Sequence, residues 1–232
     1  MKKEIFLVDA DDTVLDFHGA SAKALIYAFS ACGIAWKDEY ASVYKRVNDG
    51  LWESLERKEL TRAELIERRF PLYLSTLGFD GVDAEAFNQR YLHFLATNPI
   101  YMQGAEDFLR ALNAIGRVFI VTNGTEKIVR SRFTIAKLWD FAEDVFISEV
   151  VGCDKPGKAY TDYVEAHIAG YEKEKTIWIG DSLSADIQAA NSAGIESIWY
   201  NPHKKAAIGG AKPDYEAASF LEILKIIEKI NA

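Results

Sequence analysis

Residues 5–13 read IFLVDADDT, a short apolar run that ends in acidic residues and a threonine. Four β-prone apolar residues in a row predict a strand that is buried on both faces of a parallel sheet. Ligands of open α/β sheets gather beyond the carboxyl ends of the strands, which is where Asp9 and Asp11 fall. Two carboxylates so close together repel each other unless a cation or a shared proton compensates. Taken alone, the stretch suits a functional site and a solvated acidic turn equally well.

The bulk composition is that of an ordinary globular protein. The chain has 232 residues, of which 49% are hydrophobic and 27% are charged, and its net charge is −8. This charge offers no basic face, so we expect no nucleic-acid partner. No run approaches the roughly 18 apolar residues of a membrane span, so we expect no membrane partner. Two cysteines are too few for a disulfide framework. We therefore predict a cytoplasmic protein, as a monomer or a homodimer.

Three further apolar runs resemble the first, at residues 118–121, 145–147 and 176–179. Each run is followed by small or polar residues and then by a helical pattern. Repeated alternation of strand and helix predicts an α/β protein with a doubly wound parallel sheet, which is a Rossmann-like core.

The segment between the first two strands follows a different pattern. Residues 19–96 contain a series of amphipathic helical patterns and no convincing strand. Such a segment is too long for an ordinary crossover. We therefore predict an inserted all-helical domain at 19–96, placed over the carboxyl edge of the sheet. Residues 1–18 and 97–232 would then form the core.

The predicted strand ends bring polar side chains to one edge of the sheet. The candidates are Asp9, Asp11, Thr122, Asn123, Lys155, Asp181 and Asp186. Several carboxylates around one point suit a hard cation with oxygen ligands, and Mg²⁺ fits a site with few protein ligands. A lysine and a hydroxyl beside that cation suit a phosphoryl dianion. Each residue alone also suits a turn or loop, so the prediction of phosphoryl transfer through an aspartyl-phosphate rests on their order and shared placement.

These motifs resemble those of the haloacid dehalogenase (HAD) superfamily of phosphohydrolases. The motif D-x-D-x-T matches residues 9–13, and the Ser or Thr that follows an apolar strand matches Thr122. The Lys that is often followed by Pro matches Lys155, and G-D-x-x-x-x-D matches residues 180–186. The helical insert resembles the helical cap of this family. The resemblance therefore implies a Mg²⁺-dependent phosphatase with a HAD core and a helical cap.

The resemblance also implies a role for each motif residue. Asp9 is expected to be the nucleophile and a Mg²⁺ ligand. Asp11 is expected to protonate the leaving oxygen and then deprotonate the hydrolytic water, while its backbone carbonyl binds Mg²⁺. Thr122 and the backbone of Asn123 are expected to hold the phosphoryl oxygens.

Lys155 is expected to bridge Asp9 and the phosphate. Asp181 is expected to be a metal ligand. For Asp186 two roles stay open: it binds the metal through water, or it anchors the residues around the metal.

Other functions of the same fold fit less well. Dehalogenases of the superfamily attack carbon and lack an acidic residue at the position of Asp11. Phosphoacceptor receiver domains have no cap and carry an acceptor Asp on a middle strand, where this chain has Thr122 and Asn123. A sugar-phosphate or phosphoglycolate phosphatase remains the alternative enzyme. A non-catalytic module that binds a phosphorylated ligand is the alternative from another class, although it would not need both Asp9 and Asp11.

The helical insert holds candidates for substrate recognition. Asn48 and Trp52 are four residues apart on one side of a predicted helix, so an amide and a large ring could hydrogen-bond and stack a nucleobase. The alternative is that Trp52 packs inside the insert. These residues, with 68–70 and 148–152, resemble the pyrimidine 5′-nucleotidase branch of the superfamily, although Val14 departs from its usual pattern. The expected substrate is a small phosphomonoester, a nucleoside 5′-monophosphate.

Overall fold

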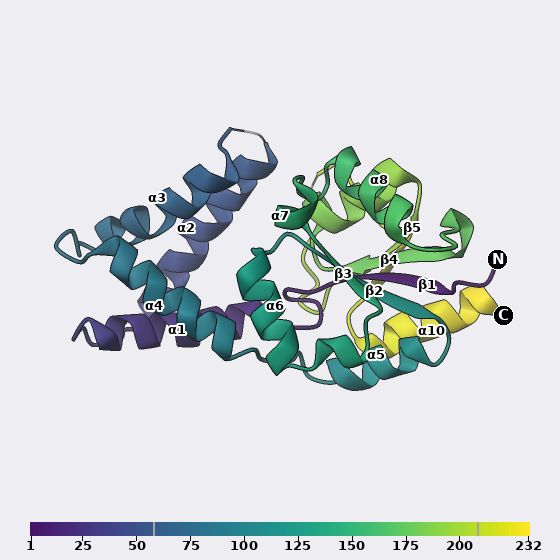
Figure 1. Cartoon of the computed structure of the whole chain (residues 1–232), viewed down its shortest axis with the longest axis horizontal. Helices are drawn as coiled ribbons and strands as arrows, with labels where there is room; N and C mark the ends of the chain where they lie inside the picture. The colour runs from purple at the N-terminus through teal and green to yellow at the C-terminus, as the bar shows by residue number, and fades with distance from the viewer. Residues whose placement is uncertain (58, 208) are drawn as a thin grey trace. The chain divides into compact units, whose positions relative to one another are not determined.

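The computed structural model of the chain describes residues 1–57, 59–207 and 209–232. The chain divides into two compact units (Figure 1). Met1–Phe17 and Pro99–Ala232 form the first unit, which we call the core unit, and His18–Asn98 form the second, the helical unit. The helical unit is an insertion between the first two strands of the core unit.

A parallel sheet organises the core unit. Among the described residues it has six strands in the order β3-β2-β1-β4-β5-β6, and every neighbouring pair is parallel. The strands are β1 (Ile5–Asp9), β2 (Arg117–Thr122), β3 (Asp144–Ile147), β4 (Thr176–Gly180), β5 (Glu196–Tyr200) and β6 (Tyr215–Ala217). The predicted doubly wound parallel sheet is confirmed. The short strand β6 was not predicted.

Helices cover both faces of this sheet. They are α5 (Ala105–Asn113), α6 (Glu126–Ile135), α7 (Ser148–Val151), α8 (Lys158–His167), α9 (Gln188–Ala193) and α10 (Phe220–Asn231), with short turns at Leu138–Asp140, Lys173–Lys175 and Leu183–Ile187. Alternate side chains of β1 face opposite layers because the strand repeats every two residues. Phe6 packs with α5, α6 and α10, whereas Leu7 packs with α8 and α9. Both residues are fully buried, so β1 is a central strand.

The two segments that join the core unit to the insert are paired with each other. Leu15 forms an isolated antiparallel bridge with Tyr101. The amide of Asp16 donates to the carbonyl of Ile100 over 2.8 Å, and the amide of Met102 donates to the carbonyl of Val14 over 3.0 Å. The chain therefore leaves and re-enters the core unit through one short ribbon.

The helical unit consists of α1 (Phe17–Ala31), α2 (Glu39–Glu56), α3 (Arg62–Thr76) and α4 (Ala84–Thr97). The helix α3 begins with a capping box in which Thr61 and Glu64 satisfy each other's backbone amides. Aromatic rings fill the centre of the unit, with Phe29, Phe70 and Phe87 fully buried. No helix in the described part of the chain is long and apolar enough to cross a membrane.

Candidate active site

The site forms at the carboxyl ends of β1 and β4, between which the winding direction of the sheet reverses. Open α/β sheets bind ligands at such a reversal, because the loops on its two sides diverge. Asp9 is the last residue of β1, and Asp181 directly follows β4. Thr122 ends the neighbouring strand β2, one residue beyond Val121, the register partner of Asp9. The structure thus brings three of the predicted motifs to one edge.

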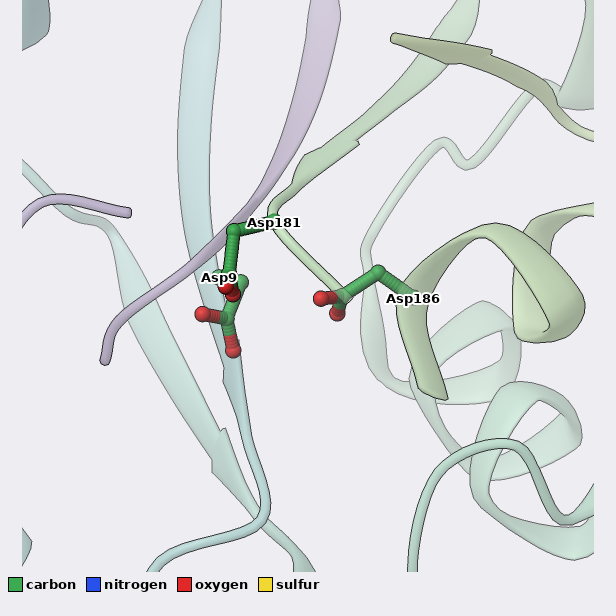
Figure 2. Close-up of side chains that lie close together, drawn as sticks. All are labelled: Asp9, Asp181 and Asp186. Carbon is green, nitrogen blue, oxygen red and sulfur yellow. The ribbon is translucent and has the colours of Figure 1, made fainter. Parts of the chain in front are cut away.

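Three carboxylates meet at this point (Figure 2). Asp9, Asp181 and Asp186 each offer an oxygen, and these oxygens all lie within 4.8 Å of one another. Asp186 comes from the turn Leu183–Ile187, which follows the loop after β4. Hard oxygen ligands at this spacing fit a divalent cation such as Mg²⁺.

Lys155 lies at the centre of the cluster. Its ammonium donates to Oδ1 of Asp9 over 2.6 Å, to Oδ1 of Asp186 over 2.7 Å and to the carbonyl of Val121 over 2.8 Å. The side chain is only 2% exposed. All three donor positions of the ammonium are therefore used, and its charge is fixed beside Asp9.

Asp186 is held on both of its oxygens. Oδ1 also accepts from Nε1 of Trp178 at 3.3 Å, and Oδ2 accepts from the amide of Ser182 at 3.2 Å. Gly180 leaves the space for this carboxylate, since a Cβ atom at position 180 would lie 2.3 Å from Cγ of Asp186. Both oxygens of Asp186 therefore accept from protein donors, and its two expected roles, binding the metal through water and anchoring the residues around it, stay predictions.

Burial and crowding shift the pKa values of these groups. Burial raises the pKa of Asp9 well above its ordinary value; Lys155 opposes the shift, while Asp186 and Asp181 add to it. Burial, followed by repulsion from Asp186, raises the pKa of Asp181 to about 7. Burial alone would lower the pKa of Lys155, but Asp186 and Asp9 outweigh it and raise that pKa. A site with this excess of negative charge favours a bound cation.

Asn123 connects the end of β2 with the loop that carries Lys155. Its Nδ2 donates to the carbonyl of Lys155 over 2.9 Å, and the amide of Lys155 donates back to its Oδ1 over 2.8 Å. This two-bond bridge fixes the loop that carries Lys155 against the end of β2. The side chain of Asn123 therefore holds the loop, and its backbone is the part that could face a phosphate.

Asp11 is paired with a residue that the sequence analysis did not select. Oδ1 of Asp11 lies 2.7 Å from Nη2 of Arg132, whose side chain is 2% exposed, while that of Asp11 is 30% exposed. Arg132 lies on the buried face of α6 with Val129 and Phe133. A charged residue in the apolar row of an amphipathic helix is a signal of a buried partner, and it could have singled out Arg132.

The two predicted specificity residues lie in α2 of the helical unit. Asn48 is 6% exposed. Trp52 is half-buried, with the guanidinium carbon of Arg62 5.5 Å from the centre of its ring. The ring therefore has a charged neighbour within this unit, and the choice between stacking and packing stays a prediction.

Comparisons with known proteins agree with this arrangement. The family model described as a haloacid dehalogenase-like hydrolase matches residues 3–194. The chain is 37% identical to the pyrimidine 5′-nucleotidase PynA of Streptococcus pneumoniae, over 97% of this chain and 95% of that one. It is 35% identical to the HAD-hydrolase YfnB of Bacillus subtilis, over 97% and 95% of the two chains. The chain therefore belongs to the haloacid dehalogenase-like hydrolases and is an enzyme, as its motifs predict.

Solved structures show the same fold. The crystal structure of YfnB bound to magnesium superposes with a TM-score of 0.92 at 34% identity, over 98% of this chain and 99% of that one. The L-2-haloacid dehalogenase of Xanthobacter autotrophicus superposes with a TM-score of 0.76 at 16% identity, over 98% and 99% of the chains. The second similarity concerns the fold alone. The choice between carbon and phosphorus chemistry must therefore come from the residues of the site.

Proposed function

We propose that this enzyme hydrolyses nucleoside 5′-monophosphates, with pyrimidine nucleotides preferred, through an aspartyl-phosphate on Asp9. The observation that carries the chemistry is the position of Asp9, which shares one buried point with Asp181 and with the ammonium of Lys155. A nucleophilic carboxylate needs positive charge beside it when it approaches a phosphoryl dianion. Asp9, Asp181 and the backbone carbonyl of Asp11 would hold Mg²⁺, which would supply further positive charge to the phosphoryl oxygens.

The first step transfers the phosphoryl group to the enzyme. Lys155 holds Oδ1 of Asp9, which leaves Oδ2 as the attacking atom. The bond from Oδ2 to phosphorus forms while the bond from phosphorus to the leaving oxygen breaks. Asp11 gives its proton to that oxygen, and the hydroxyl of Thr122 donates to a phosphoryl oxygen. The nucleoside then leaves as a neutral alcohol.

The second step releases phosphate. Asp11, now ionised, takes a proton from a water molecule, whose oxygen attacks phosphorus. The bond between phosphorus and Oδ2 of Asp9 breaks, so inorganic phosphate and the free carboxylate are formed and Asp11 is protonated again. The presence of a carboxyl group at position 11 supports phosphatase over dehalogenase chemistry. A phosphatase needs a proton donor for the leaving alkoxide, whereas attack on carbon to displace a halide needs none.

The helical unit supports a nucleotide substrate. Among the described residues, Oδ1 of Asn48 and Nε of Arg69 are buried and have no hydrogen-bond partner. The guanidinium carbon of Arg69 lies 5.5 Å from the ring centre of Tyr91, whose hydroxyl accepts from Tyr44 at 2.9 Å. Asn48 lies one helical turn beyond Tyr44 on α2. Leaving such polar groups unpaired is costly, and a pyrimidine offers the ring carbonyls and N–H groups that would satisfy them.

Two relatives point to the same substrate class. PynA and the protein YjjG of Escherichia coli, which is 26% identical over 99% of this chain and 100% of that one, are both pyrimidine 5′-nucleotidases. The cytoplasmic location, the monomeric or homodimeric state and the absence of nucleic-acid partners stay predictions of the sequence.

The proposed function is tested by phosphate release from a set of esters, each assayed with Mg²⁺ and with a chelator. We expect uridine and thymidine 5′-monophosphates to be hydrolysed with a higher kcat/KM than glucose 6-phosphate or phosphoglycolate, and we expect the chelator to abolish turnover. A preference for a sugar phosphate or for phosphoglycolate would replace the nucleotide assignment. Binding without any turnover would favour the non-catalytic module.

A further inference from the structure

We propose that Arg132 is a positioning residue for the acid–base step. In this role, which rests on the proposed function, its guanidinium holds the carboxyl group of Asp11 in the direction of the leaving oxygen. The inference concerns the orientation of one side chain, since Arg132 itself would touch neither the substrate nor the metal.

The geometry gives Asp11 one buried side and one open side. Nη2 of Arg132 lies 2.7 Å from Oδ1 of Asp11; the arginine side chain is 2% exposed and that of Asp11 is 30% exposed. The ring centre of Phe17 lies 6.0 Å from the guanidinium carbon of Arg132. Oδ1 of Asp11 therefore faces a buried positive charge at ion-pair distance, without the geometry of a hydrogen bond. Oδ2 is left for a reacting group.

The loop around Asp11 has backbone hydrogen bonds of its own. The amide of Asp12 donates to the carbonyl of Leu15 over 2.7 Å, and the amides of Val14 and Leu15 donate to the carbonyl of Ala10 over 3.0 and 2.8 Å. These bonds close the loop without any side chain. They hold the backbone, whereas the contact with Arg132 is made by the side chain of Asp11.

The position of Arg132 is also costly unless it has a purpose. Its neighbours on the buried face of α6, Val129 and Phe133, are apolar. A buried guanidinium gives little net stability compared with a well-packed apolar side chain, because its charge loses its hydration. Catalysis needs a reacting carboxyl group to be oriented to within a fraction of an ångström, and this requirement explains a buried arginine beside Asp11.

The test compares two leaving groups. An alkoxide such as that of uridine 5′-monophosphate needs a proton from Asp11 as it leaves, whereas p-nitrophenolate is a weak base and does not. We expect Arg132→Gln to lower kcat/KM for the nucleotide by about 10²-fold, the lower end of a general-acid contribution, and to change kcat/KM for p-nitrophenyl phosphate little. Because kcat/KM reports only the steps up to and including the first irreversible one, the later attack of water does not affect this comparison.

A second readout follows the later step. Misplacement of Asp11 also slows the removal of a proton from the water molecule that attacks the aspartyl-phosphate. We therefore expect Arg132→Gln to show a burst of p-nitrophenolate before a slow steady state, which loss of structure alone would not produce. Arg132→Lys keeps the charge but not the planar fork, so it should restore only part of the activity toward the nucleotide.

The matched control is Arg130→Gln. Arg130 lies on the same helix, is about half exposed and pairs with Glu126, with 2.7 Å between Nε and Oε1. This substitution should leave both kcat/KM values unchanged. Equal losses on both esters in Arg132→Gln, or no loss on either, would overturn the positioning role.

A cycle with Asp11 separates a local from a general effect. In an Asp11→Asn background, Arg132→Gln should cause no further loss of activity toward the nucleotide, since the group that it orients is already gone. A further loss would show that Arg132 acts elsewhere and would reject the proposal. If the wild-type enzyme hydrolyses sugar phosphates but not nucleotides, the nucleotide assignment fails, and the same comparison is made with the sugar phosphate.

Discussion

The ammonium of Lys155 lies 2.6 Å from Oδ1 of Asp9, although the two residues are 146 positions apart in the chain. This contact connects the first strand of the sheet with the loop between α7 and α8. It gives the proposed nucleophile a permanent positive neighbour before any metal binds. Chemistry and folding therefore share one buried ion pair at this site.

Replacement of Lys155 should lower both the stability and the activity of the enzyme. Lys155→Met would leave Asp9 and Asp186 buried without their common cation, which should cost about 3–5 kcal/mol in the free energy of unfolding. Urea denaturation measures this loss, and activity toward any ester should disappear with it. Because Mg²⁺ would replace part of the missing charge, the loss should be smaller with Mg²⁺ than with a chelator. A variant as stable as the wild type would contradict this account of the pair.

Asp9→Asn should abolish turnover while leaving the fold intact, because the amide cannot form the covalent intermediate. Phosphate release and the circular dichroism spectrum measure the two effects. The control is Asp12→Asn, which changes a neighbouring acidic residue outside the proposed machinery and should retain activity. Wild-type hydrolysis by Asp9→Asn would reject the aspartyl-phosphate route.

The stability of the metal-free enzyme should depend on pH through Asp181. Its pKa is about 7 in the folded protein, above that of an unfolded aspartate, so the folded state holds a proton that the unfolded state has lost. The free energy of unfolding should therefore fall as pH rises from about 4 to about 7 in the presence of a chelator. Asp181→Asn should weaken this trend. An equally steep fall in that variant would assign it to other groups.

Asn48→Ala should raise KM for nucleotides more than KM for p-nitrophenyl phosphate, because only the nucleotide carries a base to be recognised. Trp52→Ala should behave in the same way if its ring stacks on the base. Gln89→Ala, an exposed amide of the same unit, is the matched control. Equal effects on both esters would return Asn48 and Trp52 to a role in packing the helical unit.

Arg69→Met should affect hydrolysis of a nucleotide but not of a phosphate ester that lacks a base. If the buried guanidinium donates to a ring carbonyl, its loss should lower kcat/KM for uridine 5′-monophosphate by about 10-fold or more. Ribose 5-phosphate, which has no base, should be hydrolysed as it is by the wild type. A loss of the same size for ribose 5-phosphate would place Arg69 in the structure of the unit and not at the base.

The elements of the fold that could be predicted are those whose pattern lies in consecutive residues of the sequence. The run that ends at Asp9 predicts β1, because a short row of β-prone apolar residues is typical of a strand that is covered on both faces. The strand β6 was missed since Tyr215–Ala217 is three residues long and contains a glutamate. Its place in the sheet comes from pairing with β5, which a local pattern cannot encode.

The candidate site shows the same division. The motif residues follow predicted strands, so their convergence on one edge could be expected. The partners of Asp186 and Asp11 could not, because Lys155 and Arg132 reach them across the fold from other elements. Side-chain direction at such contacts is set by tertiary packing and leaves only an indirect trace in the sequence, such as a charge on the apolar face of α6.

The ribbon formed by Leu15 and Tyr101 has a consequence for how such enzymes diversify. The chain departs from the sheet and returns to it at adjacent points, both secured by the core unit itself. A segment of different length or sequence could be joined there without moving β1 or β2. If the helical unit chooses the substrate, as we propose, the stretch of the gene that encodes this choice is separable from the stretches that encode bond breaking, and each can change while the other is preserved.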